Sequence, residues 1–128
     1  MNIKDDLSGK WGLYQWFEEH GIEFIHPEDV DNFKALIPNG KVFECVKDDG
    51  QYITLKYADM TYRVKRDIFK PVKKPEKIIG EKIILKEKET KATIVNVAWH
   101  FQRKKHMYFL EINGKKKPSR YWAEDFES

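Results

Sequence analysis

The sequence predicts a mainly β protein made of two small barrels in tandem, with one short α-helix near the N-terminus. From residue 41 onward, apolar and polar residues alternate over short runs that are separated by turn-forming residues, as in antiparallel strands. One pattern also occurs twice. In each copy an arginine opens a short strand and a phenylalanine follows six positions later, at Arg63 and Phe69 and again at Arg120 and Phe126. Such an internal repeat predicts two similar modules.

Composition limits the protein to one ordinary domain or two very small ones. The 128 residues are 41% hydrophobic and 14% aromatic, which is enough to form a core without disulfide bonds. Cys45 is the single cysteine and cannot form an internal disulfide. Residues 1–6 lack the apolar stretch of a secretory signal, and no segment has the length needed to span a bilayer. We therefore expect a cytoplasmic protein.

Charge is distributed unevenly along the chain. The net charge is only +3, but residues 1–50 sum to −6 and residues 51–128 sum to +9. This asymmetry could steer an anionic partner to the second half, or allow the two halves or two copies of the chain to attract each other.

The first module, residues 1–70, begins with an aromatic segment at residues 11–17. The alternation of Ile22 and Phe24 predicts a short strand. A helix is expected over residues 27–37, because a proline at its first position, two acidic residues and a helical apolar spacing follow one another there. We expect the aromatic segment to pack with this helix rather than to form an exposed patch.

A three-stranded meander follows, with strands expected at residues 42–46, 52–57 and 61–65. Residues 66–69 suit a single 3₁₀ turn whose phenylalanine closes the end of the sheet. Two prolines and several lysines then indicate a stiff connector at residues 71–79.

The second module, residues 80–128, is expected to contain strands near residues 83–85, 92–99, 107–112 and 120–122. Asn113 and Gly114 favour the positive backbone angles of a two-residue hairpin turn. A closing turn at residues 124–126 completes it.

Five short strands that end in a 3₁₀ turn resemble an SH3-like small barrel, and the second module is similar to the Tudor and KOW-type relatives of that fold. The segments Trp11–Phe17, His26–Asp29, Gly40–Phe43 and Arg63–Val72 also resemble a family of small uncharacterised bacterial proteins. This resemblance implies the tandem architecture and implies no activity.

The strongest candidate site is a mixture of aromatic and basic residues in the second module. Its members are Trp99, His100, Arg103, Lys104, Lys105, Tyr108, Lys115, Lys116, Lys117, Arg120, Tyr121 and Trp122. Aromatic platforms flanked by cations suit single-stranded nucleic acids, and an aromatic cage could hold a cationic side chain. The simpler interpretation, which we favour, is that the aromatics fill the barrel and the lysines solvate two hairpin tips.

Other chemistry has little support in the sequence. The four histidines lack the spacing of a zinc site, and no cofactor motif is present, so we expect no metal and no cofactor. Cys45 lies within a strand and is expected to be a core residue. His26 is interpreted as a residue of the helix start. Catalysis would require convergent titratable groups, for which His26 with Glu28 and His100 with Arg120 are the candidate pairs.

Two hypotheses remain for function. The first is a non-catalytic binding protein that recognises a protein or peptide through the aromatic groove of a small barrel. The second is a nucleic-acid-binding module that uses the basic second barrel. The oligomeric state and the identity of the partner stay open.

Overall fold

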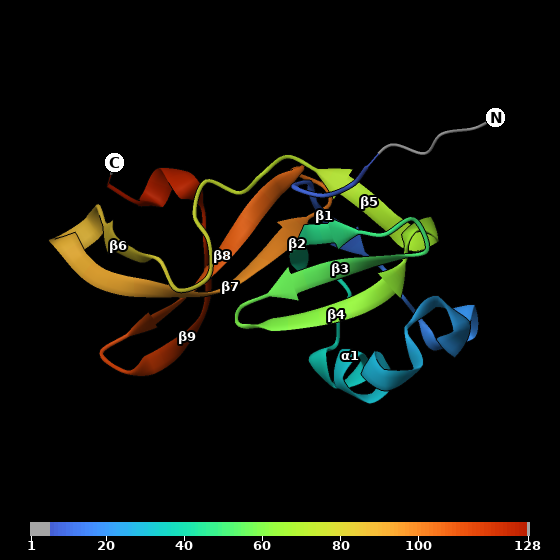
Figure 1. Ribbon diagram of the computed structural model, residues 1–128. Coiled ribbons are helices and arrows are strands. Elements are labelled where there is room, and N and C mark those ends of the chain that lie inside the picture. The colour runs from blue at the N-terminus through green and yellow to red at the C-terminus, as the bar shows by residue number, and fades with distance from the viewer. Residues whose placement is uncertain (1–5, 128) are drawn as a thin grey trace. The chain divides into compact units, whose positions relative to one another are not determined.

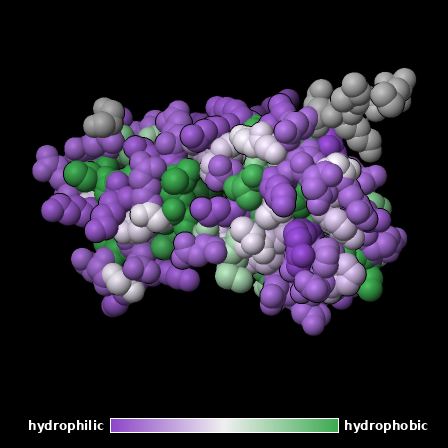
Figure 2. Space-filling view, viewed as in Figure 1, coloured by the Kyte–Doolittle hydropathy of each residue, from purple (hydrophilic) through white to green (hydrophobic). Residues whose placement is uncertain are grey.

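The computed structural model describes residues 6–127 and separates the chain into two compact units, residues 1–74 and 75–128. Residues 1–5 at the start of the chain lie outside the described residues. Each unit contains one antiparallel sheet, and the described residues contain one short α-helix. The predicted mainly β class is thereby confirmed. In the view of Figure 2, polar side chains cover most of the visible surface and small hydrophobic areas lie between them.

The first unit is built on a five-stranded sheet in the order β4-β3-β2-β1-β5. Its strands are β1 (Trp11–Tyr14), β2 (Val42–Asp48), β3 (Tyr52–Tyr57), β4 (Met60–Lys65) and β5 (Phe69–Val72). Strands β2, β3 and β4 are the predicted meander and appear as neighbouring arrows in Figure 1. A single 3₁₀ turn, η4 (Arg66–Ile68), joins β4 to β5, as the sequence predicts.

The connection from β1 to β2 is long and contains all the remaining helical structure of this unit. Three 3₁₀ turns, η1 (Glu18–His20), η2 (Ile22–Phe24) and η3 (Pro27–Asp29), precede α1 (Val30–Leu36). The predicted helix over 27–37 therefore begins with a 3₁₀ turn and ends before Ile37, whose φ of 57° is left-handed. The side chain of His26 accepts a hydrogen bond from the Glu28 N–H, which confirms its role at the helix start.

The short strand predicted at Ile22 and Phe24 is wrong. Gly21 has a φ of 91°, which turns the chain, and the Ile25 N–H donates to the Ile22 carbonyl to close the η2 turn. Only Ile25 pairs with the sheet, through a single bridge to Val64 of β4. The alternation was too short to distinguish an extended strand from a turn with one inward side chain.

The start of the predicted connector is also corrected. Pro71 and Val72 belong to β5, which pairs with β1 along its length. Proline is tolerated there because β5 lies at the edge of the sheet, where a missing N–H removes no ladder bond. Proline-rich sequence alone does not distinguish such an edge strand from a linker.

The second unit contains a four-stranded sheet in the order β6-β7-β8-β9. Its strands are β6 (Lys82–Leu85), β7 (Thr90–His100), β8 (Lys105–Ile112) and β9 (Lys115–Tyr121), with 3₁₀ turns η5 (Glu87–Glu89) and η6 (Ala123–Asp125). Asn113 and Gly114 form the predicted hairpin turn with φ values of 53° and 78°. Strand β9 therefore starts at Lys115, immediately after that turn, and five residues before the predicted strand at residue 120.

The C-terminal segment pairs briefly with β6, at the edge of the sheet opposite to β9. Phe126 bridges Leu85, the Lys86 N–H donates to the Asp125 carbonyl, and the Glu127 N–H donates to the Ile84 carbonyl. In unit 2 the order is thus C-terminal segment, β6, β7, β8, β9. This is the order β5, β1, β2, β3, β4 of unit 1.

Phe69 and Phe126 occupy corresponding positions in the two units. Each follows a 3₁₀ turn, and each donates its N–H to the carbonyl of the turn's first residue. Both side chains are buried, at 8% and 4% exposure. Phe69 pairs with the last residue of β1, and Phe126 pairs with the last residue of β6.

The aromatic segment at residues 11–17 largely packs into the core of unit 1. Tyr14 is fully buried and meets the ring of Phe33 of α1 edge-on, with 5.6 Å between centroids. Trp16 is also buried, whereas Phe17 remains 46% exposed. The segment thus joins the helix to the sheet, as the sequence predicts.

Cys45 is fully buried in β2, where its thiol donates to the Lys47 carbonyl. Burial raises the pKa of this thiol to about 11. The thiol is therefore protonated at neutral pH and serves as a small core group.

Candidate binding surface

Strand alternation gives unit 2 an outward face that is both aromatic and basic. Tyr108 and Leu110 of β8 are buried, so the intervening Phe109 and the preceding Met107 point to the other side of the sheet. Arg120 of β9 lies opposite Phe109 in the ladder. On the same side, His100 of β7 lies opposite Lys105.

We call this face the cation–indole surface. Its members are His100, Arg103, Lys105, Met107, Phe109, Arg120 and Trp122.

Trp122 is the centre of the cation–indole surface. Its ring centroid lies 4.9 Å from the guanidinium carbon of Arg103, 5.1 Å from Lys105 Nζ and 5.4 Å from the guanidinium carbon of Arg120. The ring of His100 meets the indole at 5.6 Å between centroids, close to edge-on. Each cation over an exposed ring contributes about 0.5–1 kcal/mol, so together the three cations favour one position of the indole.

One carboxylate balances part of this charge. Lys105 Nζ donates to Glu124 Oε1 at 2.6 Å, and this contact with Lys105 is the main cause that lowers the pKa of Glu124. Neither Arg103 nor Arg120 forms a salt bridge with a carboxylate in the described part of the chain. The Arg120 guanidinium instead approaches the sulfur of Met107, at 4.0 Å. Both arginines thus retain donors for an external acceptor.

The predicted site residues lie in different places on unit 2. The cation–indole surface includes His100, Arg103, Lys105, Arg120 and Trp122, and the exposed residues Lys115, Lys116 and Lys117 lie along the same strand β9. These lysines begin immediately after the Asn113–Gly114 hairpin turn and continue along β9. Lys104 lies in the β7–β8 turn with a φ of 53°.

Trp99, Tyr108 and Tyr121 lie on the opposite side of the sheet. Tyr108 is 1% exposed, and its hydroxyl accepts a hydrogen bond from the Glu76 N–H. Trp99 packs edge-on against His106, with 4.9 Å between ring centroids, and Tyr121 lies opposite Tyr108 in the ladder. These aromatics therefore belong to the inner side of the sheet, as the simpler interpretation of the sequence held.

Met107 and Phe109 belong to the surface and were missed by the sequence reasoning. The available signal was their position on either side of Tyr108. Once Tyr108 is assigned to the core, the period of two in a strand places both neighbours outside.

The surface does not suit a cage for a cationic side chain. Such cages present ring faces that are free to receive a positive charge. Here Arg103, Lys105 and Arg120 already lie around the Trp122 ring. An additional cation would meet three like charges, whereas an anionic ligand would be attracted.

The residue pairs considered for catalysis serve other roles. His26 Nδ1 caps the η3 turn, and the Glu28 carboxylate pairs with Arg63 at 3.0 Å. His100 and Arg120 both contact the Trp122 ring. Within residues 6–127, no group of three or more His, Cys, Asp or Glu side chains is arranged to hold a metal ion.

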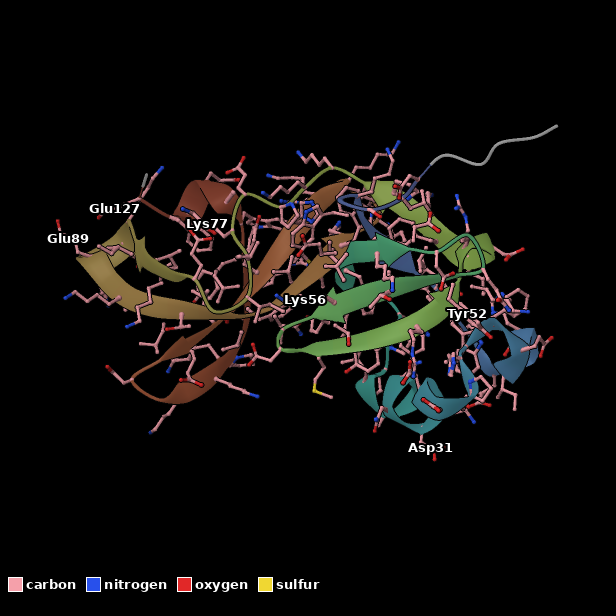
Figure 3. All side chains as sticks on the ribbon, viewed as in Figure 1. Asp31, Tyr52, Lys56, Lys77, Glu89 and Glu127 are labelled. Carbon is pink, nitrogen blue, oxygen red and sulfur yellow. The ribbon has the colours of Figure 1, made fainter. Side chains whose placement is uncertain are left out.

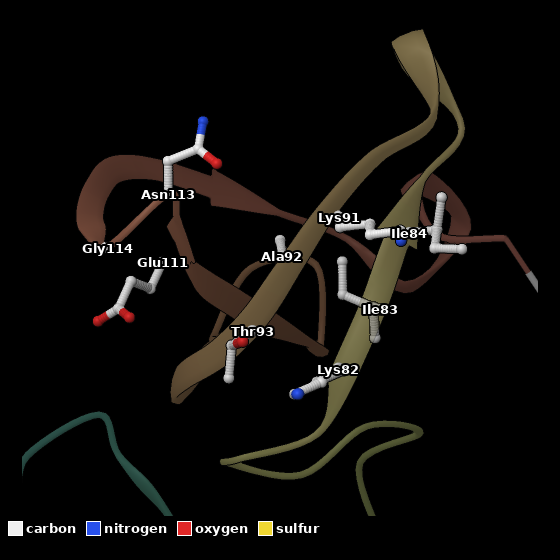
Figure 4. A pocket seen from close by; sticks show the side chains of 9 residues that line it. All are labelled: Lys82, Ile83, Ile84, Lys91, Ala92, Thr93, Glu111, Asn113 and Gly114. Atoms are coloured by element: carbon white, nitrogen blue, oxygen red, sulfur yellow. The ribbon is translucent and has the colours of Figure 1, made fainter.

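The cavities in the described part of unit 2 include two beside its sheet. One has a volume of 510 Å³, and Figure 4 shows it over the β6–β7 ladder, where Lys82 and Thr93 are opposite each other, with Glu111 nearer the Asn113–Gly114 turn. The other is a groove of 610 Å³, whose lining includes Arg120, Tyr121, Trp122 and Ile112. The second cavity therefore adjoins the cation–indole surface along the end of β9.

The described residues form a small, mainly β protein with two antiparallel sheets, and unit 2 carries the cation–indole surface. The chain belongs to the family described as a family of unknown function (DUF6960), whose model matches residues 3–127. Comparisons with curated proteins and with solved structures find no match. In the described part of the chain, no helix combines the length and apolar character needed to cross a membrane.

Proposed function

We propose that this protein is a non-catalytic binding protein built from two SH3-like barrels, and that it binds a protein or peptide partner through the cation–indole surface of the second. The observation that carries the proposal is Trp122, which lies among Arg103, Lys105 and Arg120 on the outward face of a sheet. Aromatic rings beside charged groups that still have free donors are typical of protein recognition sites.

The SH3-like architecture is supported by the common order of pairing in the two units. In each, a three-stranded meander continues through a 3₁₀ turn into a segment that pairs with the first strand. The two buried phenylalanines, Phe69 and Phe126, lie at the same step of this path. We propose that the chain contains two copies of one module.

A photocrosslinking experiment tests the binding role. Phe109 is replaced by p-benzoylphenylalanine in the full-length protein, which is expressed in cells of its source organism. We expect a discrete protein adduct that survives nuclease treatment and is lost when Trp122→Ala is added, because the indole organises the three cations. The matched control places the same photoreactive residue at Met60, which is 52% exposed on β4 of unit 1. Equal adducts from both positions, or none from position 109, would contradict the proposal.

A second candidate is binding of single-stranded nucleic acid by the same surface. The observation in its favour is the row of exposed lysines at 115–117 beside Arg120 and the Trp122 ring, which offers phosphate contacts next to a stacking platform.

Salt dependence distinguishes this candidate. If the chain binds a fluorescent single-stranded oligonucleotide, affinity should fall steeply with salt. Replacing Lys115, Lys116 and Lys117 by Gln should then reduce the slope of log Kd against log salt by about 2 to 3. The matched control replaces the exposed lysines Lys82, Lys86 and Lys91 instead. Absence of binding at low salt would eliminate this candidate.

A further inference from the structure

In unit 1 the outer edge of β4 is occupied by a segment of the same chain. Ile25 forms a bridge with Val64, and the N–H of His26 donates to the carbonyl of Arg63 at 3.0 Å. The N–H of Arg63 in turn donates to Asp29 Oδ2 at 2.9 Å. Both backbone groups of Arg63 that face the edge are therefore satisfied by residues 25–29, which we call the edge segment.

The edge segment also satisfies the charge of Arg63. Its Nε donates to Asp29 Oδ2 at 2.8 Å, and its Nη2 donates to Glu28 Oε2 at 3.0 Å. The ring of His26 packs against Tyr52 of β3, at 5.2 Å between centroids, and Tyr52 lies beside this segment in Figure 3. One short segment thus supplies an apolar bridge, a ring contact and two adjacent carboxylates.

Strand β9 is the counterpart of β4 in unit 2. Arg120 lies six residues before Phe126, as Arg63 lies six residues before Phe69. Arg120 is opposite Phe109 just as Arg63 is opposite Thr54. The next residues, Val64 and Tyr121, lie opposite the buried Ile53 and Tyr108. Because side-chain direction and hydrogen-bond direction alternate together along a strand, the N–H and C=O of Arg120 point away from β8.

At β9, however, no described segment occupies the place that the edge segment takes beside β4. Strand β9 is last in its sheet, and no described residue pairs with its outer edge. The Arg120 side chain is exposed and has no carboxylate partner in the described part of the chain. Beside it, Arg120, Tyr121 and Trp122 belong to the lining of the 610 Å³ groove, whose other charged residues are of both signs: Lys86, Glu87, Lys88, Glu124 and Asp125.

We infer that the free edge of β9 at Arg120 binds a short acidic peptide segment of a partner protein, which pairs with the edge over two residues and then turns, in the manner in which β4 holds residues 25–29. This inference rests on the proposed function and specifies its ligand. The segment has an apolar residue opposite Tyr121 and two adjacent carboxylates three to four positions later, as Ile25 precedes Glu28 and Asp29. Short backbone pairing at the sheet edge supplies part of the affinity, and the carboxylates supply selectivity.

Charge favours this occupant over a second copy of the same chain. Three consecutive lysines, Lys115–Lys117, and then Pro118 lie on β9, and two such edges would repel each other and lack a donor. The register shift between Phe109 and Glu111 further limits regular pairing to the end of the strand near Arg120. A short acidic segment would be attracted by these lysines and could bond to the free backbone groups of Arg120.

The test uses the full-length protein and a synthetic peptide with the sequence of residues 24–30, FIHPEDV, capped at both ends. The matched probe is FIHPQNV, in which both carboxylates are replaced by amides. Binding is followed by ¹⁵N–¹H NMR at low salt through the amides of residues 119–122 and the indole N–H of Trp122. We expect saturable shifts at these positions with the acidic peptide and affinity at least about tenfold weaker for the amide probe.

Charge reversal provides the second arm. Arg120→Glu should abolish the shifts with FIHPEDV and gain binding of FIHPKKV, whereas Lys82→Glu on β6 should leave FIHPEDV binding unchanged. Equal affinity for the acidic and amide peptides, or shifts that map away from β9, would overturn the inference. The inference would also be overturned if a single-stranded oligonucleotide bound more tightly than the peptide, displaced it and shifted the same amides.

The two proposals can fail separately. A protein adduct at position 109 together with no acidic preference at Arg120 overturns the edge-binding inference alone. Loss of the adduct together with no peptide shifts overturns both.

Discussion

Arg63 shows how a single side chain fixes the position of the segment that precedes the helix. Its guanidinium and backbone N–H together donate to Asp29, whose side chain is 17% exposed, and its guanidinium also reaches Glu28. Hydrogen bonds from Arg63 lower the pKa of Asp29. Because the folded pKa is depressed, this carboxylate stabilises the fold above its unfolded pKa of about 3.9, and the stabilisation is lost as pH falls through the folded value.

We therefore expect Asp29→Asn to destabilise unit 1 by about 1 kcal/mol at pH 7, since a charge-assisted contact becomes a neutral one in a partly exposed site. The difference from the wild type should shrink below pH 4, where the wild-type carboxylate is also protonated. Urea unfolding at pH 7 and pH 3 measures both values, with Asp31→Asn on the exposed side of α1 as the control (Figure 3). A difference independent of pH would contradict this electrostatic account.

Gly12 is required by space rather than by backbone conformation. A Cβ at this position would lie 2.5 Å from the Lys70 carbonyl oxygen and 2.6 Å from the ring of Phe69. Gly12→Ala should destabilise the protein by about 3 kcal/mol, because the edge strand β5 and its phenylalanine must move. Gly50→Ala is the control, since its φ is 92° but nothing lies within 4 Å, and it should cost about 1 kcal/mol. Thermal unfolding of the two variants would reveal similar losses if packing at Gly12 were unimportant.

A buried ion pair joins the η4 turn to the last residue of β2. Arg66 Nη1 contacts Asp48 Oδ2 at 2.6 Å, and the two side chains are only 13% and 2% exposed. Asp48 Oδ2 also accepts the Leu7 N–H.

Removing one partner leaves the other buried and unpaired. We expect Arg66→Met to lower the free energy of unfolding by about 3 kcal/mol. The double variant Arg66→Met with Asp48→Asn should recover part of this loss in denaturant unfolding, because no uncompensated charge remains. If the double variant is no more stable than the single one, the ion pair does not explain the loss.

At the scale of the element, Phe69 and Phe126 each follow a 3₁₀ turn and pair with the last residue of the first strand of their unit. Phe126 bridges Leu85 and meets the Tyr108 ring edge-on at 5.4 Å. Phe126→Ala should destabilise unit 2 by about 3–4 kcal/mol, because a large buried ring is removed from a small core. In an NMR spectrum we expect the amides of β6–β9 to broaden or shift while those of β1–β5 keep their positions. Equal perturbation of both groups would contradict the assignment of Phe126 to the core of unit 2.

The elements differed in how well local sequence predicted them. The meander of β2–β4 and the turn at Asn113–Gly114 were predicted because alternation and turn residues are local signals. The turn at Ile22–Phe24 and the strand β5 were not, because they depend on partners distant in sequence. Strand β1 holds β5 through pairs such as Trp11 with Val72, which no local pattern reveals.

The same distinction applies to the candidate surface. Its cations and Trp122 were identified from composition, because clustered charge is visible in the sequence. The inward direction of Tyr108 and the outward direction of Phe109 required the strand register. The contact between Arg63 and Asp29, on which the edge-binding inference depends, joins residues 34 positions apart.

At the scale of the whole molecule, the division at residues 74 and 75 predicts where a protease acts first. Residues 73 and 74 lie outside any helix or strand and are exposed. Trypsin should cleave after Lys73, since the following Lys74 precedes Pro75 and its peptide bond is resistant. Mass spectrometry of a limited digest should find the fragment beginning at Lys74 before any cut within β7 or β8. Earlier cleavage within those strands would contradict the division.

The lengths of two loops explain why one edge is occupied and the other is not. In unit 1, 27 residues connect β1 to β2. This length lets residues 25–29 of the loop reach the outer edge of β4 and bind there. In unit 2 the corresponding loop has only four residues, at most about 14 Å when extended. The β6–β7 loop is therefore too short to cross the sheet to β9, and shortening the β1–β2 loop of unit 1 would uncover the edge of β4 for an external peptide.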